Sequence, residues 1–116
     1  MAGLADRRCI PCKGGVPPLT AEQIAPWLAQ LTGWQVVDNR YLEKEYAFKN
    51  FAQALALVNR IGAIAEEQNH HPDMFLAWGK VEVSIWTHKI NGLTESDFIF
   101  AAKCDAAYAD MSGTRR

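Results

Sequence analysis

The sequence predicts an α+β fold, a two-layer sandwich in which helices cover one face of a four-stranded, mostly antiparallel sheet. Helix-capping patterns at Thr20, Asn50 and Thr94 each precede an amphipathic segment. Between them lie two pairs of short segments rich in aromatic and β-branched residues, each pair joined by turn residues. The predicted order is therefore α-β-β-α-β-β-α, with no repeat or linker dividing it.

Length and composition indicate one globular domain. The chain has 116 residues, of which 49% are hydrophobic and 22% charged, and its net charge is −1. We expect an amino-terminal arm over 1–19, a single domain over 20–110 and a flexible tail over 111–116. Lys and Arg form no basic field, so direct nucleic-acid binding is not expected. No apolar run approaches the ~20 residues of a membrane-spanning helix and no signal-peptide core is present, which predicts a cytoplasmic protein without membrane contact.

The arm contains a cysteine pair with the spacing of half a zinc site or a redox motif, Cys9 and Cys12. A second CxxC is missing, and structural zinc usually has four ligands. A redox motif would begin a helix, whereas Gly14-Gly15 and Pro17-Pro18 follow here. We therefore predict an ordered arm with reduced thiols and no chemistry of its own.

The first helix is predicted to run from its capping box toward Gly33, a natural stop. Pro26 falls just past the first turn, so we expect a kink or a late start. A hairpin follows, with strands over 34–37 and 41–48 and turn residues at Asp38-Asn39-Arg40.

The second helix is expected to follow the capping pattern at Asn50 and to end by about His71, because the residue before Pro72 avoids helical angles. A second hairpin has strands over 74–78 and 81–88, with Gly79 to supply the positive φ of the turn. The last helix is predicted to follow Thr94 and to end near residue 110.

Alternation along the fourth strand assigns its residues to two faces. Val81, Val83, Ile85 and Thr87 are predicted to face the core, which places Glu82, Ser84, Trp86 and His88 on the other face. Because a large apolar patch is rarely left exposed, this uncovered face predicts a homo-oligomer.

The three histidines of the chain, His70, His71 and His88, lie in two neighbouring segments. An unperturbed pKa near ~6.5 allows histidine to give or take a proton at neutral pH, so this concentration predicts a proton-transfer site. The structural alternative is that His70-His71 closes a helix, where cations are favoured, and that His88 is an exposed strand residue.

Three runs give a specific resemblance: Glu66-x-x-Asn69-His70-His71-Pro72-Asp73, then Thr87-His88, then Gly92-Leu93-Thr94-x-x-Asp97. In order and spacing they resemble the pterin-4a-carbinolamine dehydratase family, over roughly residues 20–108. The resemblance implies a dimeric or tetrameric enzyme that converts 4a-hydroxytetrahydropterin to quinonoid dihydropterin. It implies no metal and no organic cofactor. The implied setting is tetrahydrobiopterin recycling, with an aromatic amino acid hydroxylase as pathway partner.

The resemblance also implies roles for the histidines. His70 and His88 would be the acid and the base, and His71 would hold the pterin. Dehydration needs a proton delivered to the departing hydroxyl and another withdrawn from the neighbouring ring nitrogen, which two histidines in opposite protonation states can do. Which of them is the acid stays open.

Four further residues are substrate-binding candidates. Glu66 could orient a histidine or accept a pterin nitrogen, Trp34 could pack on the flat ring, and Pro72 and Thr87 would line the pocket by position. Competing structural readings make Glu66 a solvated carboxylate and Trp34 a core residue. Asp97 also matches the family pattern, but its place in a helix cap is a sufficient role.

Two departures and two alternative functions remain. The chain has Lys89-Ile90-Asn91 where the family usually has acidic or small residues, which changes the expected pocket charge, and Met74 where a tryptophan is common. The first alternative is a partner-binding module with weak catalysis, because animal members of the family also bridge a transcription factor's dimerisation helix. The second is a zinc enzyme with three histidine ligands, for which adjacent ligands before a proline are awkward.

Overall fold

The computed structural model describes residues 3–10 and 16–111. Its elements confirm the predicted α-β-β-α-β-β-α order and add two single 3-10 turns, η1 and η2. Cys12 and the tail from residue 112 lie outside the described residues. The elements are η1 (Leu4–Asp6), α1 (Ala21–Leu28), β1 (Gln35–Val37), β2 (Tyr41–Ala47), α2 (Phe51–Gln68), β3 (Asp73–Ala77), β4 (Lys80–Ile85), η2 (His88–Ile90) and α3 (Glu95–Met111).

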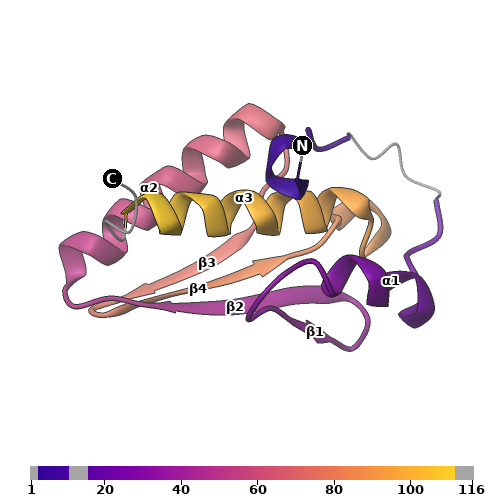
Figure 1. Ribbon diagram of the computed structural model, residues 1–116, viewed down its shortest axis with the longest axis horizontal. Coiled ribbons are helices and arrows are strands. Elements are labelled where there is room, and N and C mark those ends of the chain that lie inside the picture. The colour runs from indigo at the N-terminus through magenta and orange to yellow at the C-terminus, as the bar shows by residue number, and fades with distance from the viewer. Residues whose placement is uncertain (1–2, 11–15, 112–116) are drawn as a thin grey trace.

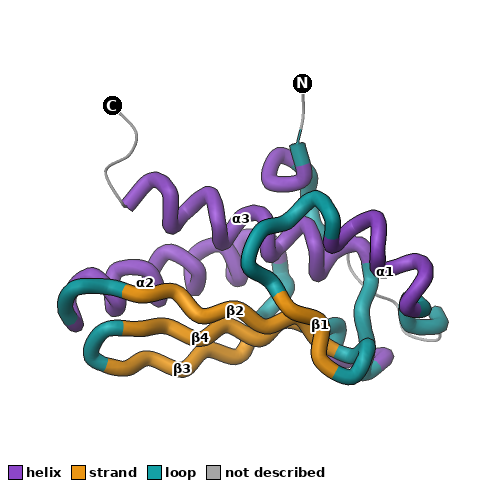
Figure 2. The backbone as a smooth tube through the Cα atoms, turned by 60° about the horizontal axis from the view of Figure 1, so that its bottom comes forward, coloured by secondary structure: helices purple, strands orange, loops and turns teal. Residues whose placement is uncertain are grey.

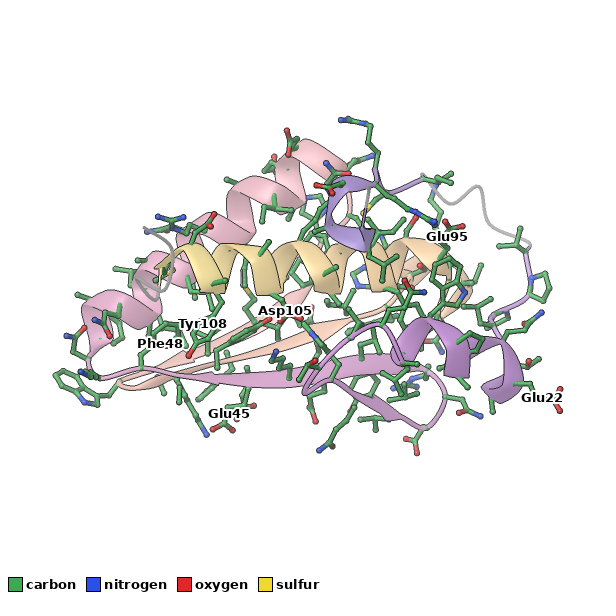
Figure 3. The ribbon with its side chains drawn as sticks, in the orientation of Figure 1. Glu22, Glu45, Phe48, Glu95, Asp105 and Tyr108 are labelled. Carbon is green, nitrogen blue, oxygen red and sulfur yellow. The ribbon has the colours of Figure 1, made fainter. Side chains whose placement is uncertain are left out.

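The sheet has the strand order β1-β2-β4-β3, and all three pairings are antiparallel. Helices α2 and α3 lie together on one side of it, as Figure 1 and Figure 2 show. Glu45 on β2 projects from the opposite, uncovered side (Figure 3). The predicted two-layer α+β architecture is therefore confirmed.

The core lies between the sheet and the two long helices. Alternate residues of β4 are fully buried, as the sequence pattern predicted, and α3 contributes further fully buried residues. Burying each such side chain contributes roughly 1.5–3 kcal/mol before the entropic cost of folding. The main apolar members are Leu42, Leu57, Ile61, Val81, Val83, Ile85, Phe98 and Phe100.

The two hairpin turns differ in the backbone feature that determines their residues. Asp38 and Asn39 both have φ of 54°, a left-handed pair in the three-residue turn between the paired residues Val37 and Tyr41. The expectation of a positive φ at Gly79 is wrong. A Cβ there would lie 3.0 Å from the carbonyl oxygen of Phe48, whose amide donates to Gly79 at 2.7 Å. Glycine is therefore needed because two backbones approach closely, not because of an unusual dihedral angle.

Helix α1 and strand β4 differ from the sequence predictions at their ends. Helix α1 begins directly after its N-cap Thr20, so Pro26 causes no late start, and it ends at Leu28 rather than near residue 33. Strand β4 ends at Ile85, and His88 opens the turn η2 instead of closing the strand. None of the described helices has the length and apolar character needed to cross a membrane.

Candidate active site

The three histidines line one pocket at the end of the sheet where the chain leaves α2 and β4. Two loops form it, the one between α2 and β3 and the one between β4 and α3. The pocket has a volume of about 160 Å³ and is half-open to solvent, which suits part of a small flat molecule better than a drug-sized ligand. Its lining residues are Asn69, His70, His71, Trp86, Thr87, His88 and Lys89.

His70 is fixed by a buried carboxylate from a different element. Asn69 adopts the left-handed conformation (φ 53°) and ends α2, which turns His70 toward the start of α3. There Nε2 of His70 lies 2.7 Å from Oδ1 of Asp97. The Asp97 side chain is fully buried and that of His70 is 12% exposed. The pair is thus shielded by protein on the Asp97 side and open to the pocket on the other.

The remaining lone pairs of Asp97 are also used. Its Oδ2 accepts a hydrogen bond from the Thr87 hydroxyl at 2.8 Å and from the Thr94 backbone N–H at 2.8 Å. With Asp97 as the acceptor, Nε2 of His70 carries the proton, and Nδ1 is the nitrogen without a partner among the described residues. Nδ1 is therefore the atom of His70 that can exchange a proton with a bound molecule.

His71 and its partner are much more exposed. Its Nε2 lies 2.7 Å from Oε2 of Glu66, one turn earlier on α2. The two side chains are 51% and 80% exposed, so this pair contributes only about 0–1 kcal/mol to stability. Pro72 follows directly and leads into β3. Glu66 therefore contacts a pocket histidine, while Pro72 is not among the pocket-lining residues.

His88 has an aromatic neighbour and no carboxylate partner among the described residues. Its ring lies 4.6 Å from that of Trp86, which also packs against Tyr41 at 5.9 Å. Trp86 is thus half-buried and does not form the open apolar patch that the sequence suggested. His88 itself is exposed at the pocket rim.

Trp34 does not join the histidines. It is buried, 6% exposed, and its indole N–H donates to Asp105 on α3 at 3.0 Å. Asp105 also accepts from Lys44 at 2.8 Å and from the Tyr46 hydroxyl at 2.5 Å. Burial, together with the nearby Cys104 and Asp105, raises the pKa of Tyr46 well above its usual range. Figure 3 shows Asp105 between α3 and β2. Of the two readings of Trp34, the structure agrees with the core residue.

Asp97 is the site residue that sequence reasoning left with a structural role only. Its cap role is real, since it accepts the Thr94 N–H. Its contact with His70 joins positions 27 residues apart and leaves no local pattern. The only available signal was a carboxylate at a matching family position.

Other features of the described residues offer less chemistry. A larger hollow of about 470 Å³ lies between the end of β2 and the end of α3, near Phe48 and Tyr108. Its lining holds Lys49 but no group that titrates near neutral pH. Within residues 3–10 and 16–111, no three His, Cys, Asp or Glu side chains are placed to hold a metal ion together.

A model of the family described as "Pterin 4 alpha carbinolamine dehydratase" matches residues 17–107. The chain belongs to this family. A relative from Rubrobacter xylanophilus is 56% identical over 105 residues, covering 90% of this chain and 98% of that protein. One from Alkaliphilus metalliredigens is 52% identical over 106 residues, covering 90% and 96%. Both are named, provisionally, as pterin-4-alpha-carbinolamine dehydratases.

Two solved structures resemble this member of the family. A transcriptional coactivator/pterin dehydratase from Brucella melitensis has a TM-score of 0.74 and 35% identity, covering 78% of this chain and 98% of that one. A pterin dehydratase-like protein, identified as a RuBisCO assembly factor in the alpha-carboxysome, has a TM-score of 0.58 and 26% identity, with 66% and 89% covered.

Proposed function

We propose that this protein dehydrates a 4a-hydroxytetrahydropterin to a quinonoid dihydropterin and water. A proton goes to the 4a-hydroxyl, the C–O bond breaks with its electron pair leaving as water, and the adjacent ring nitrogen forms a double bond to the former carbinol carbon. That nitrogen then gives its proton to a base. Atoms and charge balance with one acid and one base, and no redox partner is required.

The proposed acid is His70 and the proposed base is His88. Asp97 compensates the positive charge of a protonated His70 ring, so this ring is suited to hold the proton that the hydroxyl takes. His88 has no carboxylate partner among the described residues, so its neutral form is suited to accept one. His71, held by Glu66, would bind the polar edge of the pterin.

The observation that carries this proposal is the meeting of all three histidines of the chain at one pocket, two of them paired with carboxylates. The histidines come from loops that follow different elements. Positioned proton transfer of this kind is typically worth a factor of ~10² to 10⁴ for each group.

The test is stopped-flow dehydration of a synthetic 4a-hydroxypterin, with the spontaneous rate subtracted. His70→Ala, His71→Ala and His88→Ala should each lower the catalysed rate at least ~10-fold, because each removes a positioned proton carrier or binding group. Asn59→Ala, at an exposed position of α2, is the matched control and should keep the wild-type rate.

The proposal also predicts the outcome of chemical rescue. Free imidazole added to His70→Ala or His88→Ala should restore part of the rate, whereas it should not change the control. A wild-type protein that leaves the spontaneous rate unchanged, or three histidine variants with wild-type rates, would rule the proposed activity out.

The proposed setting is a cytoplasmic protein in tetrahydrobiopterin recycling, supplying an aromatic amino acid hydroxylase pathway. We also propose a homodimer or homotetramer. Four large apolar side chains support self-association, because each is 40–69% exposed on α2, β3 or the turn after β3: Phe51, Leu55, Phe75 and Trp78. Light scattering at working concentration tests this, and a monomer would contradict it.

The alternative function is a partner-binding module with feeble catalysis. The names of the two solved structures favour keeping it, since one includes transcriptional coactivator and the other RuBisCO assembly factor. The presence of all three histidines favours catalysis as the main role. A folded protein without dehydration activity would favour the alternative.

A further inference from the structure

The amino-terminal segment is docked against the two junctions that carry the His70–Asp97 pair. Residues 4–10, here the docked arm, lie over the start of α3 beside the end of α2 (Figure 1). Leu4 and Cys9 are each only 8% exposed. This segment is therefore part of the packed structure, although it lies 59 to 98 residues away in sequence from its hydrogen-bond partners outside the segment.

Three hydrogen bonds anchor the carboxyl end of the docked arm. The backbone N–H of Cys9 donates to Oε1 of Gln68 at 2.8 Å. The backbone of Ile10 both donates to the Ser96 hydroxyl at 2.7 Å and accepts from it at 3.0 Å. Gln68 is the last residue of α2, two before His70, and Ser96 directly precedes Asp97. The anchors are thus next to the catalytic pair on both sides of it.

Burial makes these anchors exceptional. Within the described residues, the buried polar or charged side chains are Gln68, Thr87, Ser96 and Asp97. Thr87 and Asp97 hold His70, and the other two hold the docked arm. Polar burial is unfavourable unless hydrogen bonds replace those to water. These four buried polar or charged residues are therefore concentrated where the arm meets the proposed acid.

A second part of the same segment touches the loop of His88. Leu19 donates from its backbone to Leu93 at 2.9 Å. Pro18 lies against Gly92, where a Cβ would come within 2.5 Å of its ring. Residues 18–19 thus pack against the carboxyl end of the loop that begins with η2, which contains the proposed base.

From these contacts we propose that the docked arm is a positioning element, which holds Gln68 and Ser96 so that His70 and Asp97 meet at the distance that proton transfer requires. This inference rests on the proposed function for its catalytic consequence. The end of α2 and the start of α3 are helix termini, which open locally more easily than helix centres. A displacement of about 1 Å at a catalytic group can cost ~10²-fold in rate. The surface contacts of the arm, such as the Arg7–Glu95 ion pair at 3.0 Å, dock it without reaching the pair.

The test uses full-length variants of the two anchors. Ser96→Ala removes both bonds to Ile10, and Gln68→Met keeps the side-chain length but removes the acceptor for Cys9. Each should lower kcat about 10-fold or more with KM within about twofold, and should change the acid limb of the pH–rate profile. Ser96→Thr keeps the hydroxyl and should restore most of kcat. Arg7→Ala, in the same segment, is the matched control and should keep the wild-type kcat and pH profile.

A readout independent of activity keeps the inference separate from the proposed reaction. In ¹H,¹⁵N spectra, the Nε2–H resonance of His70 should be protected by Asp97 in the wild type and should broaden or exchange faster in Ser96→Ala and Gln68→Met. Loss of thermal stability without any change in kcat, pH profile or this resonance would overturn the inference. A wild type without dehydration activity would instead overturn the proposed function, and the resonance would still decide the role of the arm.

Discussion

Two carboxylates on α3, Asp97 and Asp105, each gather three hydrogen-bond donors but are suited to different tasks. They are eight residues apart, so about 12 Å separates them along the helix axis. Asp97 binds Thr87, Thr94 and the His70 ring, which opens to a pocket. Asp105 binds Trp34, Lys44 and Tyr46, which link α3 to the first hairpin.

The difference lies in the protons that the donors carry. Trp34, Lys44 and Tyr46 keep theirs at neutral pH, and burial raises the pKa of Tyr46 further, so the Asp105 cluster is chemically inert. His70 is the one donor of either cluster whose ordinary pKa lies near neutrality. Both carboxylates accept three hydrogen bonds. The Asp97 cluster is suited to proton transfer because one of its donors is the His70 imidazole, whereas the Asp105 cluster is suited to a structural role.

The largest expected effect comes from replacing the two carboxylates in parallel. Asp97→Asn should lower the dehydration rate ~10²-fold or more, because the amide cannot compensate the charge of a protonated His70. Asp105→Asn should keep the rate within about threefold and lower the free energy of unfolding by about 1–3 kcal/mol, because its three donors lose a charged acceptor. Stopped-flow rates and urea unfolding measure both. Equal loss of rate in the two variants would remove the distinction between the clusters.

A second, smaller effect is expected from the lysine of the histidine pocket, Lys89, which differs from Lys44 of the Asp105 cluster. Lys44 is paired with Asp105 at 2.8 Å, whereas Lys89 lines the histidine pocket without an ion pair in the described part of the chain. Lys89→Met should lower kcat/KM three- to fivefold for a pterin with an anionic side chain, the size expected of one exposed charge pair. A neutral pterin should be affected less than twofold.

Salt dependence and a matched variant control this prediction. The loss in Lys89→Met should shrink at high salt because exposed charges are screened. Lys49→Met, outside the histidine pocket, should not distinguish the two pterins. Equal effects of Lys89→Met on anionic and neutral pterins would show that this lysine does not select the substrate charge.

The last effect concerns the stability of the Asp105 cluster at alkaline pH. Tyr46 has an unfolded pKa of about 10 and a higher one when folded, so above pH ~10 the unfolded chain releases a proton that the folded chain keeps. The free energy of unfolding should therefore fall as pH rises through this range, by at most about 1.4 kcal/mol per pH unit. Tyr46→Phe should flatten this slope, as measured by urea unfolding between pH 8 and 11. An unchanged slope would show that Tyr46 is not held protonated.

The fold was largely predictable because its signals are local. The capping box at Thr20, the N-cap at Asn50, the turn at Asp38-Asn39 and the alternation along β4 are all confirmed. Gly79 was assigned the wrong reason, because close approach to Phe48 depends on a distant backbone. The end of β4 was set too late, because the bridge between Thr87 and Gly92 depends on how a loop closes.

The candidate site was predictable only in part. The histidines were found because their residue type is rare in this chain and its chemistry is specific. The partner of His70 and the anchors of the docked arm were not, because a carboxylate, a serine and a glutamine are common and their contacts span 27 to 86 residues. One of the two readings of Trp34 placed it in the histidine pocket, whereas it is buried beside Asp105. No local sequence pattern distinguishes a tryptophan that lines a pocket from one in the core.

The most direct test of the central claim is an NMR titration with an unreactive, oxidised pterin, observing the imidazole and indole nitrogens together. The account predicts that the rings of His70, His71 and His88 and the indole of Trp86 shift with one common dissociation constant, while the indole of Trp34 does not move. Shifts at Trp34 without shifts at the three imidazoles would contradict it.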